Sequence, residues 1–301
     1  MSPTVSVVVF GYRNESTAVA AVASVREQAA ADLAGSEAME IIFVTSGGDS
    51  SAALVRAHAT DVTVIESPTR WLPGAARNAG VAATTGPVVA FLEADCEAEP
   101  GWLASRLEAH RGGHPVVASA MTCSGPSRPW SWAGHYTVFR ARLPGQPAGP
   151  LAPDDPAAHG LSFARDVLDR IGPFDETLRI GEDTDTLQRL RDLGIDVWFE
   201  PQARTGHRGP RSTRELLADA YHRGRRSADY ARLGGERVDP VLAVVRFVPR
   251  WLRELYGTVV SAWRRGRGER WRIVVALPWI AIATAARRAG YTAEQLRTRD
   301  D

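Results

Sequence analysis

The sequence predicts an α/β protein: a Rossmann-like mixed, mostly parallel sheet flanked by helices, with a helical appendage at its C-terminal end. Within the first 121 residues, short apolar segments alternate with helix-forming segments, as strands and crossover helices do. The apolar segments are nearly continuous, as expected of strands buried on both faces. From about residue 239, apolar stretches interrupted by Arg replace this alternation and predict basic amphipathic helices.

The alternation places each element. The predicted strands cover residues 4–10, 40–45, 62–66, 88–92 and 116–121, with a further one at 197–199, and the predicted helices cover 16–34, 51–59, 74–84 and 100–111. Residues 122–160 are rich in turn residues and aromatic side chains and predict a long functional loop region. We therefore expect one domain over 1–238, with halves 1–121 and 122–238, and a tail over 239–301.

Polar loops follow four of the predicted strands. They cover residues 11–15, 46–50, 67–73 and 93–97. Open sheets of this class bind ligands outside the carboxyl ends of their strands. The sequence therefore predicts a ligand-binding cleft lined by these loops.

Two acidic clusters are candidates for the chemistry of that cleft. Glu93 and Asp95 follow an apolar run, and residues i and i+2 of a strand share a face, so both carboxylates could approach one hard cation. Glu182 and Asp183 open a helix predicted over 181–194, where a carboxylate beside a substrate hydroxyl could act as a general base. Together the clusters indicate an enzyme that handles a cation and a proton.

Each of these features also has a purely structural interpretation. The first cluster could be a solvated acidic turn before the helix at Pro100. The second could complement the helix dipole and cap free N–H groups. His207, in a predicted loop after a strand, could be a metal or phosphate ligand or an exposed surface side chain. No P-loop, GxGxxG, nucleophile elbow or HExxH motif is present.

Composition is that of an ordinary globular protein. The 301 residues are 44% hydrophobic and 24% charged, enough to bury a large core. Cys96 and Cys123 have neither metal-binding nor redox spacing, so a reducing cytosol is the default compartment. The apolar residues 5–10 are interpreted as a first strand and not a signal peptide, since no basic region precedes them and no cleavage site follows.

Charge is distributed unevenly along the chain. Residues 241–301 hold twelve Arg and five acidic residues, a net of +7; since the total is +1, the remainder carries −6, which argues against nucleic-acid binding there. The uncharged run 273–286 is shorter than the ~20 residues that span a bilayer. Arg246, Arg250 and Arg253 stand among apolar residues, as in helices that lie on an anionic membrane. The alternative to membrane association is that the tail forms a helical cap on the first domain or a dimer contact.

Several motifs stand in a characteristic order over residues 4–230. They are GYRNE at 11–15, PGAARNAG at 73–80, VAFLEADC at 89–96, IGPFDE at 171–176 and GEDTD at 181–185, followed by Arg189, Gly194, Pro201 and His207. In order and spacing they resemble a family 2 glycosyltransferase of the GT-A fold.

The resemblance implies an inverting, metal-dependent transfer of a single sugar from a nucleotide-diphospho-sugar to an acceptor hydroxyl. Asp183 would be the base that deprotonates the acceptor, with Glu182 beside it. Asp95 and His207 would hold the Mn²⁺ or Mg²⁺ at the donor diphosphate. The residues that the resemblance places against the donor are Tyr12, Asn14, Glu15, Ser46, Arg77, Glu93, Ala94 and Asp95.

The sequence departs from the family pattern in two places. Thr45 and Ser46 stand where members usually carry two Asp, and Glu93 stands where Asp is usual. These changes motivate an alternative, a catalytically degenerate binding or scaffold protein on the same fold. A nucleotidyltransferase is a further alternative, but 11–14 matches its Gly-rich basic loop poorly.

The C-terminal part bears on the acceptor. The Gln-x-x-Arg-Trp motif of processive synthases is missing after His207, so transfer of one sugar is expected. The basic apolar tail predicts a lipid-linked or membrane-proximal acceptor. It also predicts a cytoplasmic protein that is peripheral on the inner face of the membrane.

Overall fold

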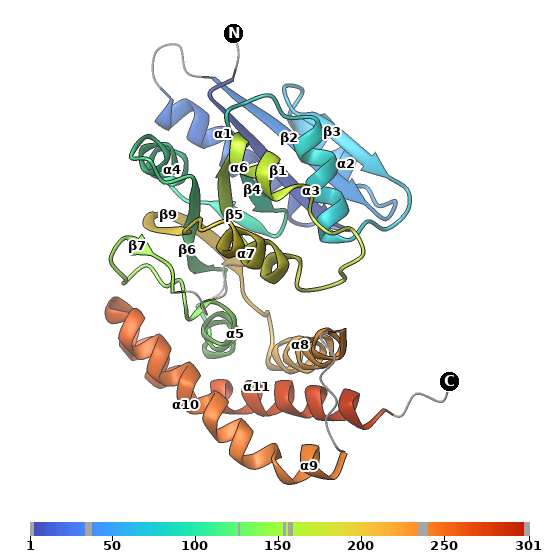
Figure 1. The fold of residues 1–301 in the computed structure, drawn as a ribbon, viewed down its shortest axis with the longest axis vertical. Coiled ribbons are helices and arrows are strands. Elements are labelled where there is room, and N and C mark those ends of the chain that lie inside the picture. Colours follow the sequence, from blue (N-terminus) through green and yellow to red (C-terminus); the bar gives the residue numbers. More distant parts are fainter. Residues whose placement is uncertain are drawn as a thin grey trace. The chain divides into compact units, whose positions relative to one another are not determined.

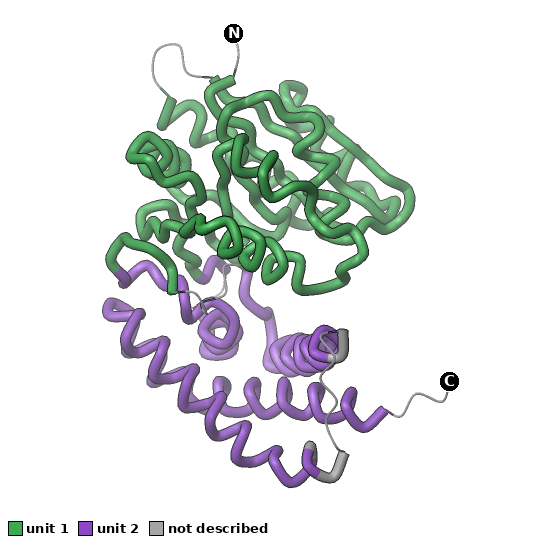
Figure 2. The backbone as a smooth tube through the Cα atoms, in the orientation of Figure 1, with its two compact units in different colours: residues 1–122, 147–207 green, residues 123–146, 208–301 purple. Residues whose placement is uncertain are grey.

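The computed structural model describes residues 3–33, 38–125, 127–152, 155, 159–233 and 240–297. The chain divides into two units, the first made of residues 1–122 and 147–207 and the second of residues 123–146 and 208–301 (Figure 2). The boundary predicted between residues 238 and 239 falls within 234–239, outside the described residues, so the predicted domains 1–238 and 239–301 stay a prediction.

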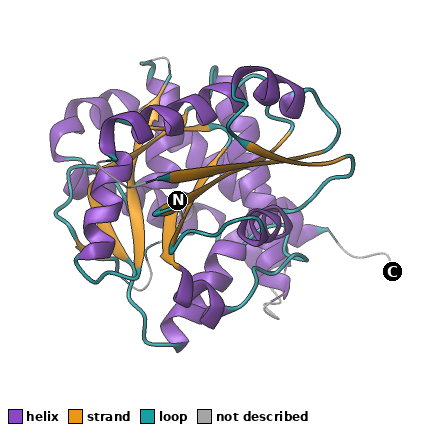
Figure 3. Ribbon diagram, turned by 90° about the horizontal axis from the view of Figure 1, so that it is seen from above, coloured by secondary structure: helices purple, strands orange, loops and turns teal. Residues whose placement is uncertain are grey.

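A mixed sheet forms the centre of the first unit (Figures 1 and 3). Its strands are β1 (Val5–Tyr12), β2 (Met39–Ser46), β3 (Thr63–Ser67), β4 (Val88–Glu93), β5 (Cys96–Ala98), β6 (Val116–Ser124), β7 (Gly149–Pro150), β8 (Leu161–Ala164) and β9 (Trp198–Arg208). The order is β3-β2-β1-β4-β8-β6-β9-β5, with β7 on β9. The strands β1 to β4 are parallel, whereas β8 is antiparallel to β4 and β6.

Helices cover both faces of this sheet. They are α1 (Ala18–Asp32), α2 (Ser51–His58), α3 (Pro73–Ala82), α4 (Trp102–Arg111), α6 (Arg165–Ile171) and α7 (Glu182–Asp192). Val5, Val7 and Val9 of β1 pack into the core shared with α1, α2 and α4. Val8 and Phe10 pack into the core shared with α3, α6 and α7. Because both faces of the strand are buried, its sequence is apolar at every position from Val7 to Phe10.

Several predicted loops contain regular structure. Strand β1 continues through Tyr12, and the predicted loop 93–97 includes the start of the short strand β5. His207 is not in a loop but in β9, where its backbone is the register partner of Cys96. These segments extend because each finds a neighbouring strand that satisfies its backbone N–H and C=O groups, which residue type alone does not reveal.

The predicted long loop 122–160 contains helix α5 (Pro129–Phe139). Pro129 starts the helix at a position where a missing N–H costs nothing. Trp132, Tyr136 and Phe139 follow at spacings of four and three residues and are buried. This helical period was present in the sequence, but the surrounding prolines and glycines obscured it.

The second unit is helical. With α5 it contains α8 (Thr213–Leu233), α9 (Pro240–Val245), α10 (Phe247–Arg265), a 3₁₀ turn (Arg267–Glu269) and α11 (Arg270–Leu296), as Figure 1 shows. Glycines set the spacing of α8 and α11: a Cβ on Gly224 would collide with the carbonyl oxygen of Arg287, and one on Gly290 with that of Tyr221. The two backbones therefore approach as closely as glycine allows.

Helix α11 is longer than the uncharged run 273–286, because it continues past the arginines on both sides. By length and composition alone, residues 267–296 could cross a membrane, and no other described helix could. A third of the most apolar window, 33%, is buried within the structure. The core helix of a soluble protein passes the same test, so this helix is weak evidence for a membrane span.

Acidification should destabilise the first unit through His110 on α4. Burial, and secondarily the charge of Arg106, lowers the pKa of His110 from 6.5 to about 4. Because the unfolded chain binds this proton more tightly, the stability is present above pH 6.5 and is lost as the pH falls toward 4. Between pH 7 and pH 5 we expect the unfolding free energy to fall by about 2 kcal/mol more in the parent protein than in His110→Gln, measured by urea titration. Equal losses in both proteins would contradict a neutral, buried imidazole.

Candidate functional site

Arg77 of α3 joins the two acidic clusters. Its Nη1 donates to Oε1 of Glu182 at 2.9 Å. Its Nη2 lies 3.0 Å from Oδ1 of Asp183 and 3.4 Å from Oε1 of Glu93. Glu93 ends β4, whereas Glu182 and Asp183 begin α7. One guanidinium therefore brings together carboxylates that are about ninety residues apart in the chain.

This guanidinium is buried. Arg77 is 6% exposed, and its Cζ lies 4.6 Å from the centre of the Phe10 ring. Burial by itself would lower the pKa of Arg77, but the charges of Asp183, Glu182 and Glu93 outweigh it and raise the pKa above its ordinary value. Three carboxylates thus share one fixed positive charge, which leaves the cluster short of positive charge.

Contacts beside Arg77 hold α3 against the segment that precedes α7. Asn78 Nδ2 donates to the carbonyl oxygen of Phe174 at 2.9 Å, and Asn78 Oδ1 accepts the N–H of Phe174 at 2.9 Å. A Cβ on Gly74 would collide with the carbonyl oxygen of Asp175. The helix and this segment are therefore closely packed, and this packing positions Arg77 for its ion pairs.

A line of side chains leads from the buried cluster to Asp95. Nδ1 of His159 lies 3.3 Å from Oε1 of Glu93, and the His159 and His207 ring centres are 5.7 Å apart. Nε2 of His207 lies 3.9 Å from Oδ2 of Asp95. Side-chain exposure rises from 11% at Glu93 to 48% at Asp95, so the line ends at the surface of the unit. His159 has a φ of 66°, in the left-handed region that few residues other than glycine adopt.

Tyr12 and Ser46, at the carboxyl ends of β1 and β2, are register partners in different environments. Tyr12 is 38% exposed, and the guanidinium carbon of Arg70 lies 4.6 Å from the centre of its ring. Ser46 is buried, and its hydroxyl accepts the N–H of Trp71 at 3.1 Å. Tyr12 is thus partly exposed beside Arg70, whereas Ser46 holds the loop after β3.

The other predicted donor-binding residues have mainly backbone or local contacts. The Oδ1 atom of Asn14 is buried and has no hydrogen-bond partner among the described residues. Oε1 of Glu15 accepts the N–H of Ser50 at 2.9 Å. Ala94 is buried, and its N–H donates to the carbonyl oxygen of Phe10 at 2.8 Å. An unpartnered buried acceptor such as that of Asn14 is a place where a ligand donor would be favoured.

The structure adds two residues to the predicted set. His159 lies between Glu93 and His207, and its only signal in the sequence is a histidine before Gly160 in a turn-rich segment. Arg70 lies over the ring of Tyr12, and it stands in the predicted cleft loop 67–73, whose sequence has no feature that singles out this arginine. The space beneath Arg77 is nearly closed, with a cavity of about 10 Å³.

A sequence model of the family described as glycosyl transferase family 2 matches residues 6–171, more than half of the chain. The chain belongs to glycosyl transferase family 2. The matched span includes Arg77, Glu93 and Asp95 and ends before Glu182. The predicted resemblance is thereby confirmed at the level of the family.

Curated relatives include the pre-mycofactocin glycosyltransferases of two Mycobacterium tuberculosis strains, CDC 1551 / Oshkosh and ATCC 25618 / H37Rv. Each is 28% identical over 213 residues, which cover 66% of this chain and 43% of the relative. The chain therefore spans less than half the length of these relatives.

Two solved structures show the same fold. The mannosyltransferase PcManGT from Pyrobaculum calidifontis, in complex with GDP-Man and Mn²⁺, aligns with a TM-score of 0.59 at 17% identity and covers 100% of this chain and 89% of its own. S. aureus TarS 1-349 aligns with a TM-score of 0.52 at 16% identity, over 98% of this chain and 90% of its own. The predicted GT-A type of fold, with its C-terminal helices, is confirmed.

Asp95 and His207 carry donor atoms of the kinds that divalent cations bind. No group of three or more His, Cys, Asp or Glu residues suited to a metal occurs in the described part of the chain. Two atoms that each lie about 2.1 Å from one ion can be at most about 4.2 Å apart. The separation of 3.9 Å between Asp95 Oδ2 and His207 Nε2 satisfies this limit. A carboxylate and an imidazole would leave the remaining positions to substrate oxygens and water, as Mg²⁺ and Mn²⁺ sites often do.

Removing the Arg77 guanidinium should destabilise the first unit strongly. Arg77→Ala leaves three carboxylates without their shared partner, and loss of one partner of a buried pair costs about 3–5 kcal/mol. Arg56→Ala is the control, because Arg56 and its partner Glu66 are 52% and 36% exposed and such pairs contribute at most about 1 kcal/mol. Urea unfolding of both variants measures the difference. Equal losses would show that Arg77 does not hold the unit together.

Proposed function

We propose that the chain catalyses transfer of a single sugar from a nucleotide-diphospho-sugar to an acceptor hydroxyl, with inversion at the anomeric carbon and with a divalent metal. Membership of glycosyl transferase family 2 supports transfer from a sugar nucleotide. The GDP-Man and Mn²⁺ of the mannosyltransferase structure are consistent with a nucleoside diphosphate donor and a metal.

The observation that carries this proposal is the line of groups from Asp183 to Asp95. Arg77 connects Asp183 to Glu93, and His159 and His207 continue the line to Asp95. The proposed base for the acceptor and the proposed carboxylate for the cation therefore belong to one constellation. Such a constellation can deprotonate a hydroxyl and stabilise a leaving diphosphate at the same time.

Asp183 and Glu182 differ in their availability. The side chain of Asp183 is 22% exposed, whereas that of Glu182 is 9% exposed. Arg77 holds Oδ1 of Asp183 at 3.0 Å and fixes the orientation of the carboxylate. We assign Asp183 as the general base, with Glu182 positioning Arg77.

The reaction is one displacement. The acceptor hydroxyl gives its proton to Asp183 while its oxygen forms a bond to the anomeric carbon. The bond between that carbon and the diphosphate oxygen breaks, and the nucleoside diphosphate leaves with the bonding electrons. Attack from the face opposite the leaving group inverts the configuration. A divalent cation held by Asp95 and His207 would neutralise charge on the diphosphate.

The nucleotide would lie over the carboxyl ends of β1 and β2. Tyr12 offers an exposed ring that Arg70 backs, and the buried acceptor of Asn14 would receive a hydrogen bond. Glu15, Ser46 and Ala94 would shape the loops around this surface, and their local hydrogen bonds support this role.

The acceptor would be lipid-linked or close to a membrane, and the protein would bind the inner face of that membrane from the cytoplasm. In the second unit, α10 exposes Val248, Leu252 and Tyr256 at 54%, 50% and 71%. Exposed apolar residues beside arginines suit the interface of an anionic bilayer. This arrangement supports a peripheral association.

Asp183→Asn should remove the base and leave donor binding intact. We expect the rate of transfer to fall by about 10²–10⁴, the usual contribution of general base catalysis, with an unchanged affinity for donor. Asp185→Asn is the matched control, since Asp185 lies on the same helical turn and pairs with Arg189 at 2.6 Å. Initial rates with a competent donor and acceptor measure the difference. A full rate in Asp183→Asn would remove Asp183 as the base.

Asp95→Asn should abolish metal-dependent donor binding. Thermal shifts with UDP, GDP, dTDP, CMP and ADP, each with and without Mn²⁺, measure it. At a ligand concentration a hundredfold above Kd, binding stabilises the fold by about 2.7 kcal/mol. We expect one nucleotide to raise the Tm of the parent protein only when Mn²⁺ is present. Asp95→Asn should lose this Mn²⁺-dependent shift, whereas the control variant Glu97→Gln should keep it. Equal shifts in parent and Asp95→Asn would exclude Asp95 as a ligand, and no shift in any protein would favour the degenerate scaffold.

A further inference from the structure

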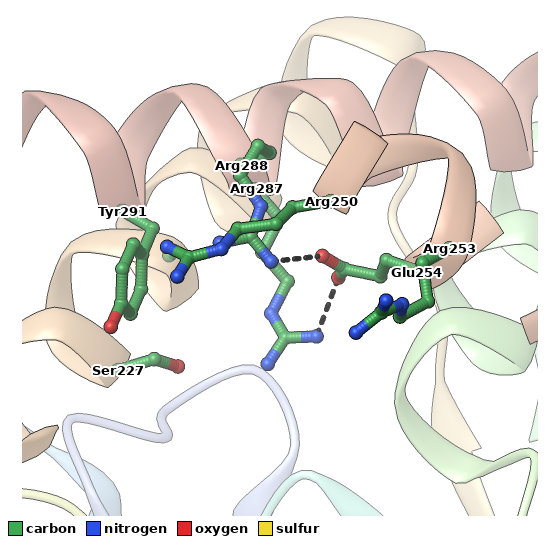
Figure 4. Close-up of a pocket in the computed structure, with 8 residues that line it drawn as sticks. Ser227, Arg250, Arg253, Glu254, Arg287, Arg288 and Tyr291 are labelled. Atoms are coloured by element: carbon green, nitrogen blue, oxygen red, sulfur yellow. Dashed lines mark hydrogen bonds and ion pairs between the residues drawn. The ribbon is translucent and has the colours of Figure 1, made fainter. Parts of the chain in front are cut away.

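A cavity of about 440 Å³ in the second unit is lined by arginines (Figure 4). The lining residues are Gly224, Ser227, Arg250, Arg253, Glu254, Arg287, Arg288 and Tyr291. They come from α8, α10 and α11, so no single helix forms it. Four guanidinium groups face one carboxylate, which makes the cavity strongly positive.

Two of the four arginines are paired within the cavity. Glu254 accepts from Nη1 of Arg287 at 2.7 Å and from Nη2 of Arg288 at 3.2 Å, and Figure 4 shows both interactions as dashed lines. Arg250 and Arg253 make no ion pair or side-chain hydrogen bond with any described residue. The cavity therefore has two uncommitted guanidinium groups, each a donor suited to an oxyanion.

The cavity is built on a rigid base. Gly224 lies at the close contact between α8 and α11, where a Cβ would collide with the carbonyl oxygen of Arg287. Arg288 lies over Tyr291, with its Cζ 5.1 Å from the ring centre, and its buried Nε has no hydrogen-bond partner among the described residues. Glu254 is held by two arginines. Much of the cost of ordering Arg287 and Arg288 beside an anion is therefore met within the fold.

The position of the uncommitted arginines on α10 identifies the source of the anion. Successive helical residues lie about 100° apart, so Val248, Leu252 and Tyr256 occupy one sector of about 80°. By the same spacing of 100° per residue, Arg250 and Arg253 lie in the neighbouring sector of α10. The apolar sector is exposed, and the arginine sector reaches the cavity. A ligand with a phosphate group beside apolar chains matches this pair of surfaces.

We propose that this cavity binds the phosphate group of an anionic membrane lipid, while the apolar sector of α10 contacts the acyl region beside it. The proposal rests on the membrane part of the proposed function and is independent of the transfer chemistry. Phosphate oxygens would accept hydrogen bonds from Arg250 and Arg253. Arg287 and Arg288 would add charge without leaving Glu254.

The test compares two double variants of the full chain. Arg250→Gln with Arg253→Gln removes the uncommitted pair, and Arg264→Gln with Arg267→Gln removes the same charge from exposed positions that do not line the cavity. Co-sedimentation uses phosphatidylcholine vesicles with and without phosphatidylglycerol. Both variants lose the same amount of nonspecific attraction to the anionic vesicles, because both lose two positive charges. A specific site predicts that the affinity of the cavity variant for these vesicles falls by a further factor of about ten or more. Circular dichroism and the Tm establish that both variants fold.

Titration with inorganic phosphate distinguishes a lipid from a soluble ligand. If the cavity variant loses phosphate binding but keeps vesicle binding, the site takes a soluble phosphate compound and the lipid assignment is overturned. Equal vesicle loss in the two variants, or no vesicle binding by the parent protein, overturns it as well. The Mn²⁺-dependent nucleotide shift, measured on the same samples, reports on the transferase proposal separately, because none of these arginines belongs to that site.

Discussion

The first unit depends on the guanidinium of Arg77. A buried group with one positive charge and three carboxylate partners holds the end of β4 and the start of α7 on one side of α3. Burying four charges is expensive, and the arrangement is stable only while each keeps its partner. Gly74 and Asn78 serve the same arrangement, because close packing and paired hydrogen bonds leave α3 little freedom to move away.

Each acidic cluster contains one buried carboxylate and one more exposed carboxylate. Glu182 and Glu93 have side chains 9% and 11% exposed and pair with Arg77. Asp183 and Asp95, at 22% and 48%, are the more accessible members. Glu182 and Asp183 are adjacent in α7, and adjacent helical residues point about 100° apart, so the two side chains can lie in different environments. Each cluster thus has one buried carboxylate that pairs with Arg77 and one more accessible carboxylate, to which the proposed chemistry is assigned.

Arginine has a second use in the helical unit. There Glu254 joins Arg287 and Arg288, and Arg250 and Arg253 have no partner of this kind among the described residues. In the Arg77 cluster three carboxylates share one guanidinium, so negative charge is in excess. In the helical cavity the guanidinium groups exceed the carboxylate, so an anion is favoured. The same pair of residue types therefore gives opposite local charge, according to which of the two is in excess.

The α/β class, the parallel strands β1 to β4 and the acidic clusters could be predicted from the sequence, because apolar periodicity and acidic spacing are local properties. The sequence also pointed to the family through motifs that remain contiguous. The helix at 129–139 has a helical period in its own sequence, which the neighbouring prolines and glycines obscure. The fold was needed to place His207 in a strand and to bring His159 between Glu93 and His207. The ion pairs of Arg77 and the arginine cavity likewise needed the fold. Both depend on contacts between segments far apart in the chain, and a local pattern cannot specify which distant backbone or charge will be its neighbour.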